Sequence, residues 1–380
     1  MKKIAAIALA VLSAASANAA ISITPMTSFG GGDGWLSPAE YARLGIASES
    51  RGLAYNPVTK NLLLATSQGT PSPSIRVLNS LSGVETGTLN TAGITGGDRA
   101  INQIGVAADG AIYVANLRAR QTAANTYRIY RFSDESATAT VAFSGSPLID
   151  ARIGDSFDVI GSGANTRLVA GYGNAASPAP QNLPGANGYA VFSSVDGLAY
   201  TAENQVFPVS PAAGSTATGD FRLGITFTDA DSVIGTASQT FRISDYAAGT
   251  GTLVSSYNSL VSGNRIMDYA EIGGLKLLAV ARADTNAASG RLRIYDVSDP
   301  LNVTQLIETE GGLTTTSGTL TTNANGTGQI KFGEINGNTA NLYVMSTNQG
   351  IQAFTIVVPE PTTLGLAALA VPALLRRRRA

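Results

Sequence analysis

Short apolar runs recur along the chain between stretches rich in Gly, Thr, Ser and Asn. Each run has the length of a single β-strand. Six of them are landmarks: residues 62–65, 112–115, 168–170, 233–235, 277–280 and 342–345. From one landmark to the next the spacing is 44 to 65 residues, near the ~40 to 50 residues of a propeller blade with room for loop insertions. The pattern therefore predicts six repeated β-units.

A second type of strand follows each landmark in most units, and this one alternates between polar and apolar positions. It is seen at residues 74–78, 127–132, 241–243, 292–295 and 352–356. Alternation places arginine on one face and branched or aromatic carbons on the other, as a half-buried strand requires. Tight turns are predicted at Asp109-Gly110, Asp196-Gly197 and Asn336-Gly337, because these pairs tolerate positive φ angles. Helix is expected only as one short turn at residues 38–44.

These features predict an all-β chain whose residues 20–357 form a single β-propeller of six blades, since closing a ring removes most exposed strand edges. The last unit supplies only three strands. We expect residues 20–28, with Ile21, Ile23 and Pro25 on one side, to add the fourth strand and close the ring. The alternatives are seven blades, with one more in 172–232 or 281–341, a β-solenoid, or stacked sandwiches.

The first 19 residues have the pattern of a signal peptide. Lys2 and Lys3 form a basic region, residues 4–12 are apolar, and Ala17-Asn18-Ala19 offers small side chains. A signal peptidase recognises this arrangement. We expect cleavage after Ala19 and export of the remainder.

The C-terminal segment, residues 358–380, combines three features. It contains Pro359, Glu360 and Pro361, an uncharged run at 362–375, and a terminal arginine cluster of Arg376, Arg377, Arg378 and Arg379. The run reaches ~21 Å as a helix against a hydrocarbon core of ~30 Å, so it predicts a short transmembrane segment that is inserted transiently. The four arginines are costly to transfer through hydrocarbon and act as a membrane stop on the cytoplasmic side.

This arrangement resembles the sorting signal of the PEP-CTERM family of bacterial envelope proteins. The resemblance implies that an exosortase recognises the Pro-Glu-Pro motif and processes the tail. It further implies a cell-surface or extracellular-matrix location, after transient anchoring in the inner membrane, and an association with exopolysaccharide or a surface protein. Residues 51–57 are also similar to uncharacterised exported bacterial propeller proteins that carry this tail.

The composition narrows the chemistry. The chain contains no Cys and no His, which excludes a Ser-His-Asp triad, a Cys-His pair and His-based zinc or copper sites. Hydrolysis by paired carboxylates needs neither residue and remains open. We assign no catalytic residue and no metal-ligand set, and we expect no cofactor, with Ca²⁺ as the one alternative.

The charge of the body argues against nucleic acid as a partner. Without the two lysines and four arginines of the terminal segments, but with Glu360 retained, 19 basic residues face 26 acidic ones, a net charge of −7. An acidic body of this kind has no basic stripe to neutralise phosphates.

Charged residues stand at similar positions before the landmark strands of several units, and they form the candidate ligand mouth. They are Arg51, Asp98, Arg99, Asp155, Asp158, Asp268 and Glu334. Loops that enter the innermost strands of a propeller gather near one end of its channel, so these side chains are candidates for a polar pocket that binds a ligand or Ca²⁺. Alternatively, each charge satisfies backbone groups in its own loop.

Three function classes remain. The first is a non-catalytic surface or matrix protein whose propeller binds a glycan or another protein. The second is a carboxylate-based enzyme, with or without Ca²⁺, that acts on a polysaccharide or a lactone. The third is a structural spacer in the envelope. The missing His and Cys favour the first.

Overall fold

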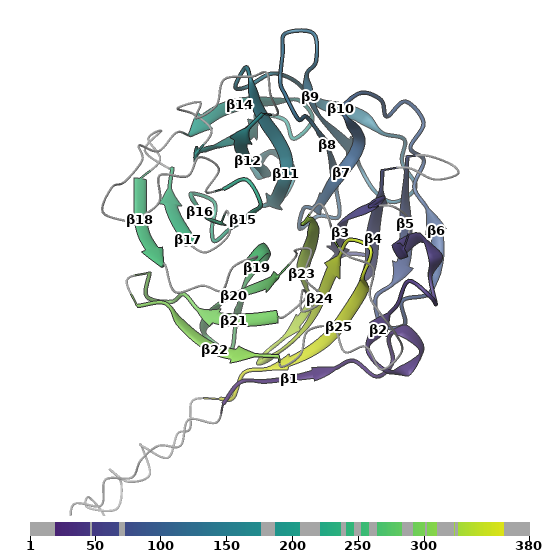
Figure 1. Cartoon of the computed structure of the whole chain (residues 1–380), viewed down its shortest axis with the longest axis vertical. Coiled ribbons are helices and arrows are strands. Elements are labelled where there is room, and N and C mark those ends of the chain that lie inside the picture. The colour runs from purple at the N-terminus through teal and green to yellow at the C-terminus, as the bar shows by residue number, and fades with distance from the viewer. Residues whose placement is uncertain are drawn as a thin grey trace, which may run out of the picture.

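A computed structural model shows a six-bladed β-propeller (Figure 1). It describes residues 20–45, 48–67, 73–175, 187–205, 221–236, 241–246, 252–257, 264–282, 292–300, 302–309, 323 and 326–360. The only helices in these ranges are short 3₁₀ turns: η1 (Gly30–Gly32), η2 (Ala42–Gly45) and η3 (Gly163–Asn165). The prediction of six blades is confirmed, and the alternatives of seven blades, a solenoid and stacked sandwiches are wrong.

Each blade is an antiparallel sheet whose strands follow one another outwards from the channel. The first three blades are β3 (Ser50–Asn56), β4 (Asn61–Thr66), β5 (Ser74–Asn79) and β6 (Glu85–Thr88); β7 (Arg99–Val106), β8 (Ile112–Leu117), β9 (Tyr127–Phe132) and β10 (Thr140–Gly145); and β11 (Ala151–Ile160), β12 (Arg167–Asn174), β13 (Tyr189–Ser194) and β14 (Tyr200–Gln205).

The fourth and fifth blades repeat this order, and the sixth uses strands from both ends of the chain. They are β15 (Gly224–Phe227), β16 (Ser232–Thr236), β17 (Phe241–Asp245) and β18 (Thr252–Tyr257); β19 (Asn264–Ile272), β20 (Leu275–Arg282), β21 (Leu292–Asp296) and β22 (Thr304–Glu308); and β23 (Gly328–Asn336), β24 (Thr339–Ser346), β25 (Gly350–Val357) and β1 (Ser22–Pro25). The short β2 (Trp35–Leu36) also pairs with β25.

The landmark runs are the second strands of the blades, β4, β8, β12, β16, β20 and β24, and not the innermost ones. Both faces of such a strand pack against neighbouring blades, so consecutive side chains are apolar and buried. Leu62, Leu63 and Leu64 of β4 are all fully buried. The innermost strand borders the channel instead and therefore carries polar residues.

The predicted ring closure is confirmed. β1 pairs antiparallel with β25, with Ser22 opposite Val357 and Pro25 opposite Phe354. Both ends of the described chain thus lie at the outer edge of the sixth blade (Figure 1). Of the helical turn expected at residues 38–44, only the end is helical: the 3₁₀ helix η2 spans Ala42–Gly45.

The predicted signal peptide, Pro361 and the arginine cluster lie outside the described residues. Pro359 and Glu360 follow β25 and are at least partly exposed. Within the described ranges, no helix combines the length and the apolar character that a membrane crossing requires.

Candidate functional site

The innermost strands β3, β7, β11, β15, β19 and β23 form the wall of the central channel, each in contact with the next around the ring. We call the end of the channel where these strands begin the entry mouth, and the end where they finish the exit mouth. Arg51 and Asp155 lie on the entry side, and Tyr55 and Ile160 lie on the exit side. The two mouths carry different chemistry.

Gln329 of β23 fills the channel between the two mouths. Its Oε1 accepts hydrogen bonds from the backbone N–H of Leu53 (2.8 Å) and Ile104 (3.2 Å), while its Nε2 donates to the carbonyls of Ile104 (3.0 Å) and Phe157 (3.4 Å). One buried amide therefore joins the inner strands of four blades, β23, β3, β7 and β11.

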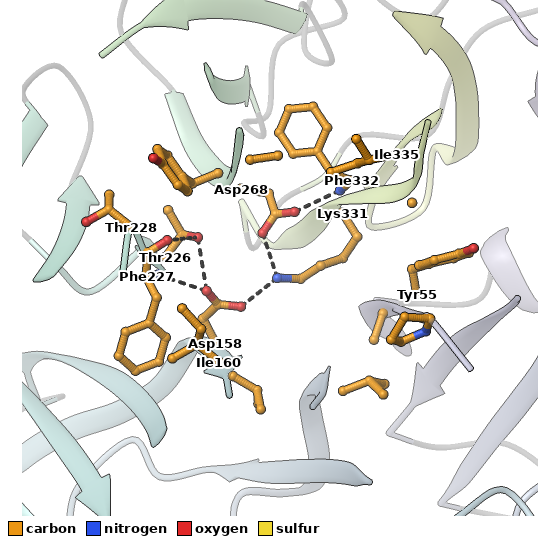
Figure 2. Close-up of a pocket in the computed structure, with 17 residues that line it drawn as sticks. Tyr55, Asp158, Ile160, Thr226, Phe227, Thr228, Asp268, Lys331, Phe332 and Ile335 are labelled. Atoms are coloured by element: carbon orange, nitrogen blue, oxygen red, sulfur yellow. Dashed lines mark hydrogen bonds and ion pairs between the residues drawn. The ribbon is translucent and has the colours of Figure 1, made fainter. Parts of the chain in front are cut away.

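A buried ion cluster lies on the exit side of Gln329, and Figure 2 shows its charged members Asp158, Asp268 and Lys331. The ammonium of Lys331 donates to Asp158 Oδ1 at 2.6 Å and to Asp268 Oδ1 at 2.8 Å. Asp158 Oδ2 also accepts from Thr226 Oγ1 (3.0 Å) and Phe227 N (2.9 Å), and Asp268 Oδ2 accepts from Phe332 N (2.7 Å). The cluster thereby connects β11, β15, β19 and β23, and its two carboxylates converge on one ammonium.

A hollow of about 350 Å³ opens above this cluster at the exit mouth. Asp158, Asp268 and Lys331 form its polar part (Figure 2). Apolar and aromatic side chains make up most of the remaining wall, among them Tyr55, Ile160, Phe227, Tyr269, Phe332 and Ile335. A concave site with mostly apolar walls and a few convergent polar groups is the usual form of a small-ligand site.

The charges of the cluster do not balance, because one ammonium faces two carboxylates. Burial is the main cause that raises the pKa of Asp268 to about 6, and the negative charge of Asp158 adds to it, while Lys331 only partly offsets both. The two carboxylates in turn raise the pKa of Lys331 despite its burial. At neutral pH the cluster carries a net charge of −1, and Asp268 is the group that takes up a proton as the pH falls.

The raised pKa of Asp268 predicts a pH-dependent stability. A carboxyl group that binds its proton more tightly in the folded state stabilises the fold below its unfolded pKa of 3.8, and this contribution is lost as the pH rises through about 6. The free energy of unfolding of the wild type, relative to that of Asp268→Asn, should therefore fall between pH 4 and pH 6. Urea denaturation at several pH values measures it, and a constant difference would contradict the assignment.

The structure divides the residues of the candidate ligand mouth into separate groups. Asp158 and Asp268 meet at the exit-side hollow. Asp155 and Arg51 lie on the entry side, where Asp155 pairs with Arg152 and Arg222. Each of these carboxylates bonds to groups outside its own loop.

The other three predicted residues, Asp98, Arg99 and Glu334, do not line the hollow. Asp98 accepts from Ala119 N at 2.8 Å and lies 3.7 Å from Arg118. Arg99 donates to Ser67 Oγ at 2.6 Å. Glu334 pairs with Lys60 at 3.2 Å, and both side chains are about half exposed.

No group of three Asp or Glu side chains in the described ranges lies close enough together to hold a metal ion. Between Asp158 and Asp268, the position that a cation would take is occupied by the ammonium of Lys331. The polar groups of the hollow are therefore suited to hydrogen bonding with a ligand.

Sequence reasoning missed Lys331, Thr226 and Gln329. A signal for two of them existed in β23, where Gln329 and Lys331 alternate with the buried Ile330 and Phe332. Such alternation places both polar side chains on one face of the strand. Once β23 is known to be an innermost strand, that face is the channel.

No family model matches the chain, and no curated protein matches it. Among solved structures, it is similar to a DUF4623 family protein from Bacteroides eggerthii, with 14% identity and a TM-score of 0.61 over 90% of this chain and 75% of that one. This likeness shows a shared propeller fold.

Two further solved structures align less well. One is a gluconolactonase, XC5397 from Xanthomonas campestris, with 13% identity, a TM-score of 0.47 and coverage of 83% of this chain and 88% of that one. The other is Sqt1 of Saccharomyces cerevisiae, with 10% identity, a TM-score of 0.44 and coverage of 82% and 86%. The order of its strands defines the chain as a six-bladed β-propeller.

Proposed function

We propose that this protein is exported, sorted by an exosortase through its Pro-Glu-Pro motif, and displayed at the cell surface or in the extracellular matrix. In this proposal its propeller binds an uncharged glycan at the exit mouth and catalyses no reaction. The exit-side hollow, with its ion cluster and aromatic wall, is the observation that supports the binding function.

The polar groups of the hollow match the hydroxyl groups of a sugar. Lys331 uses two of its three ammonium protons on Asp158 and Asp268, and the third has no partner among the described residues. The carboxylate oxygens keep lone pairs that accept further hydrogen bonds. A donor next to acceptors is the arrangement that a hydroxyl group, itself donor and acceptor, fits best.

The walls and the size of the hollow agree with a short glycan segment. Tyr55, Tyr269 and Phe332 offer apolar surface to the C–H faces of a sugar ring. The volume of about 350 Å³ is at the lower end of the ~300–1,000 Å³ of small-ligand pockets. A chain end or a few sugar units therefore fits better than a long polymer segment.

Truncation of Tyr269 should weaken glycan binding without loss of the fold. Tyr269 lines the hollow, is partly exposed, and bonds through its hydroxyl to Glu271 outside the ion cluster. Tyr269→Ala should bind about tenfold more weakly than wild type, because tyrosine is enriched among the interface residues whose truncation costs more than ~1 kcal/mol. Isothermal titration with a panel of neutral bacterial and algal polysaccharide fragments measures this.

The matched control is Tyr41→Ala, since Tyr41 is also partly exposed but bonds to Glu85 in the first blade, away from the hollow. Equal affinity of both variants and wild type for the panel would contradict binding in the hollow. Assaying the titrated samples for new reducing ends or opened lactones also tests for catalysis.

A second candidate function is carboxylate catalysis on a polysaccharide or a lactone. It is favoured by one observation, the pKa of about 6 for Asp268 in a hollow shared with Asp158. A carboxylic acid with a raised pKa next to an ionised carboxylate can act as a general acid. New reducing ends or opened lactones that appear with wild type and disappear with Asp268→Asn would replace the binding proposal with this one. A protein that binds nothing in the panel would agree with a structural spacer.

A further inference from the structure

The exit-side hollow is layered from its floor to its rim. The inner strands run from the entry mouth to the exit mouth, so a later residue of a strand lies nearer the rim. In β11 the order is Asp158 and then Ile160, and in β23 it is Lys331 and then Ile335. Residues two apart in a strand share a face, which places Ile160 on the channel side one step outside Asp158. The charges of the hollow therefore lie at its floor.

Part of the rim is a continuous apolar arc, formed by Pro57, Val106, Ile160 and Ile335. These four residues line the hollow and belong to the first, second, third and sixth blades, which are neighbours in the ring. Ile335 is 45% exposed and the other three are partly exposed. Figure 2 shows Ile160 and Ile335 around the ion cluster. Apolar surface that borders a concave site is typical of a ligand-binding groove.

The rest of the rim is more polar. Thr228 lines it on the fourth blade, and Tyr269 adds a hydroxyl group on the fifth. The hollow thus presents hydrogen-bonding groups at its floor and along one side, and apolar surface along the other side. A ligand that matches both layers is amphipathic.

We propose that the exit mouth selects a sugar that carries an apolar substituent, such as an alkyl or acyl chain. The hydroxyl groups of the sugar bond to the ion cluster, and the substituent packs against the apolar arc. This inference rests on the proposed function, because it takes the same hollow as the glycan site and names the kind of glycan. An unsubstituted sugar satisfies the floor but leaves the apolar arc in contact with water, which forfeits the gain from covering it.

Charge and size limit the ligand further. The floor carries a net charge of −1, since Lys331 faces both Asp158 and Asp268. An anionic sugar such as a uronic acid is therefore disfavoured. The volume of about 350 Å³ is small for a ligand pocket, so a single ring with a short chain fits better than a lipid-sized one.

The test is isothermal titration of the full-length protein with the methyl and hexyl glycosides of glucose, galactose and mannose. The hexyl glycosides are kept below the concentration at which they form micelles. At least one of them should bind about tenfold more tightly than the methyl glycoside of the same sugar. Burial of two methylene groups against the apolar arc accounts for a factor of about ten.

Two substitutions in the apolar arc test where the chain binds. Ile335→Thr and Val106→Thr, in different blades, should each reduce the ratio of hexyl to methyl affinity about threefold, because threonine places a hydroxyl group where the alkyl chain packs. The matched control is Val141→Thr in β10, the outermost strand of the second blade, where Val141 is 56% exposed. It should leave the ratio unchanged.

The outcomes separate this inference from the proposed function. Equal affinity for hexyl and methyl glycosides overturns the inference alone, and binding of neither kind overturns both. A preference for the hexyl glycosides that persists in Ile335→Thr and Val106→Thr places the chain away from the apolar arc and also overturns the inference.

Discussion

Replacing Lys331 by methionine should lower the free energy of unfolding by about 3–5 kcal/mol at pH 7, the usual cost of removing one partner from a buried ion pair. The substitution leaves Asp158 and Asp268 buried side by side without their cation. As the pH falls below about 6, Asp268 takes up a proton, and the difference from wild type should shrink. Chemical denaturation at pH 7 and pH 4.5 measures both effects.

Lys60→Met is the matched control for this variant. Lys60 pairs with Glu334 at 3.2 Å, but both side chains are about half exposed. A pair of this kind contributes about 0–1 kcal/mol. If Lys331→Met costs no more than Lys60→Met, or costs the same at both pH values, the ion cluster does not hold the inner strands together.

Replacing Gln329 by methionine should be comparably destabilising, for a different reason. The side chain keeps its length but loses its hydrogen bonds, so the N–H groups of Leu53 and Ile104 remain buried without acceptors. Each buried group left unsatisfied costs about 1–3 kcal/mol, so the two N–H groups predict a loss of about 2–6 kcal/mol in total. Circular dichroism during urea denaturation measures the loss.

The control is Gln305→Met in β22, where the glutamine is exposed at the outer edge of the fifth blade. An exposed substitution of this kind should change the free energy of unfolding by no more than about 0.5 kcal/mol. Equal stability of the two variants would mean that water replaces the amide of Gln329 in the channel.

The fold could be predicted from the sequence because one strand of each blade is buried on both faces. That burial makes residues such as Leu62, Leu63 and Leu64 a continuous apolar run, and six such runs define six blades. The position of each apolar run within its blade could not be predicted from the sequence. An apolar run indicates burial on both faces but does not say which polar strand lies on its channel side.

The site was predictable only in part, for the same reason. Asp158 and Asp268 stand out as isolated charges, but their approach to a common point depends on the twist and register of three blades. Lys331, which joins them, lies 173 residues from Asp158 and 63 residues from Asp268 in the sequence. Contacts between blades follow from the geometry of the ring. The residue pattern of a single strand carries no information about that geometry.

The pairing of β1 with β25 also determines the order in which the protein can be completed. Ser22 is synthesised more than 300 residues before its partner Val357. Contacts between segments so distant in the sequence form late, and unpaired strand edges in the meantime invite aggregation. A nascent chain of this protein therefore holds β1 without its partner until β25 has been synthesised, and a product truncated before Gly350 has no strand with which to close the ring.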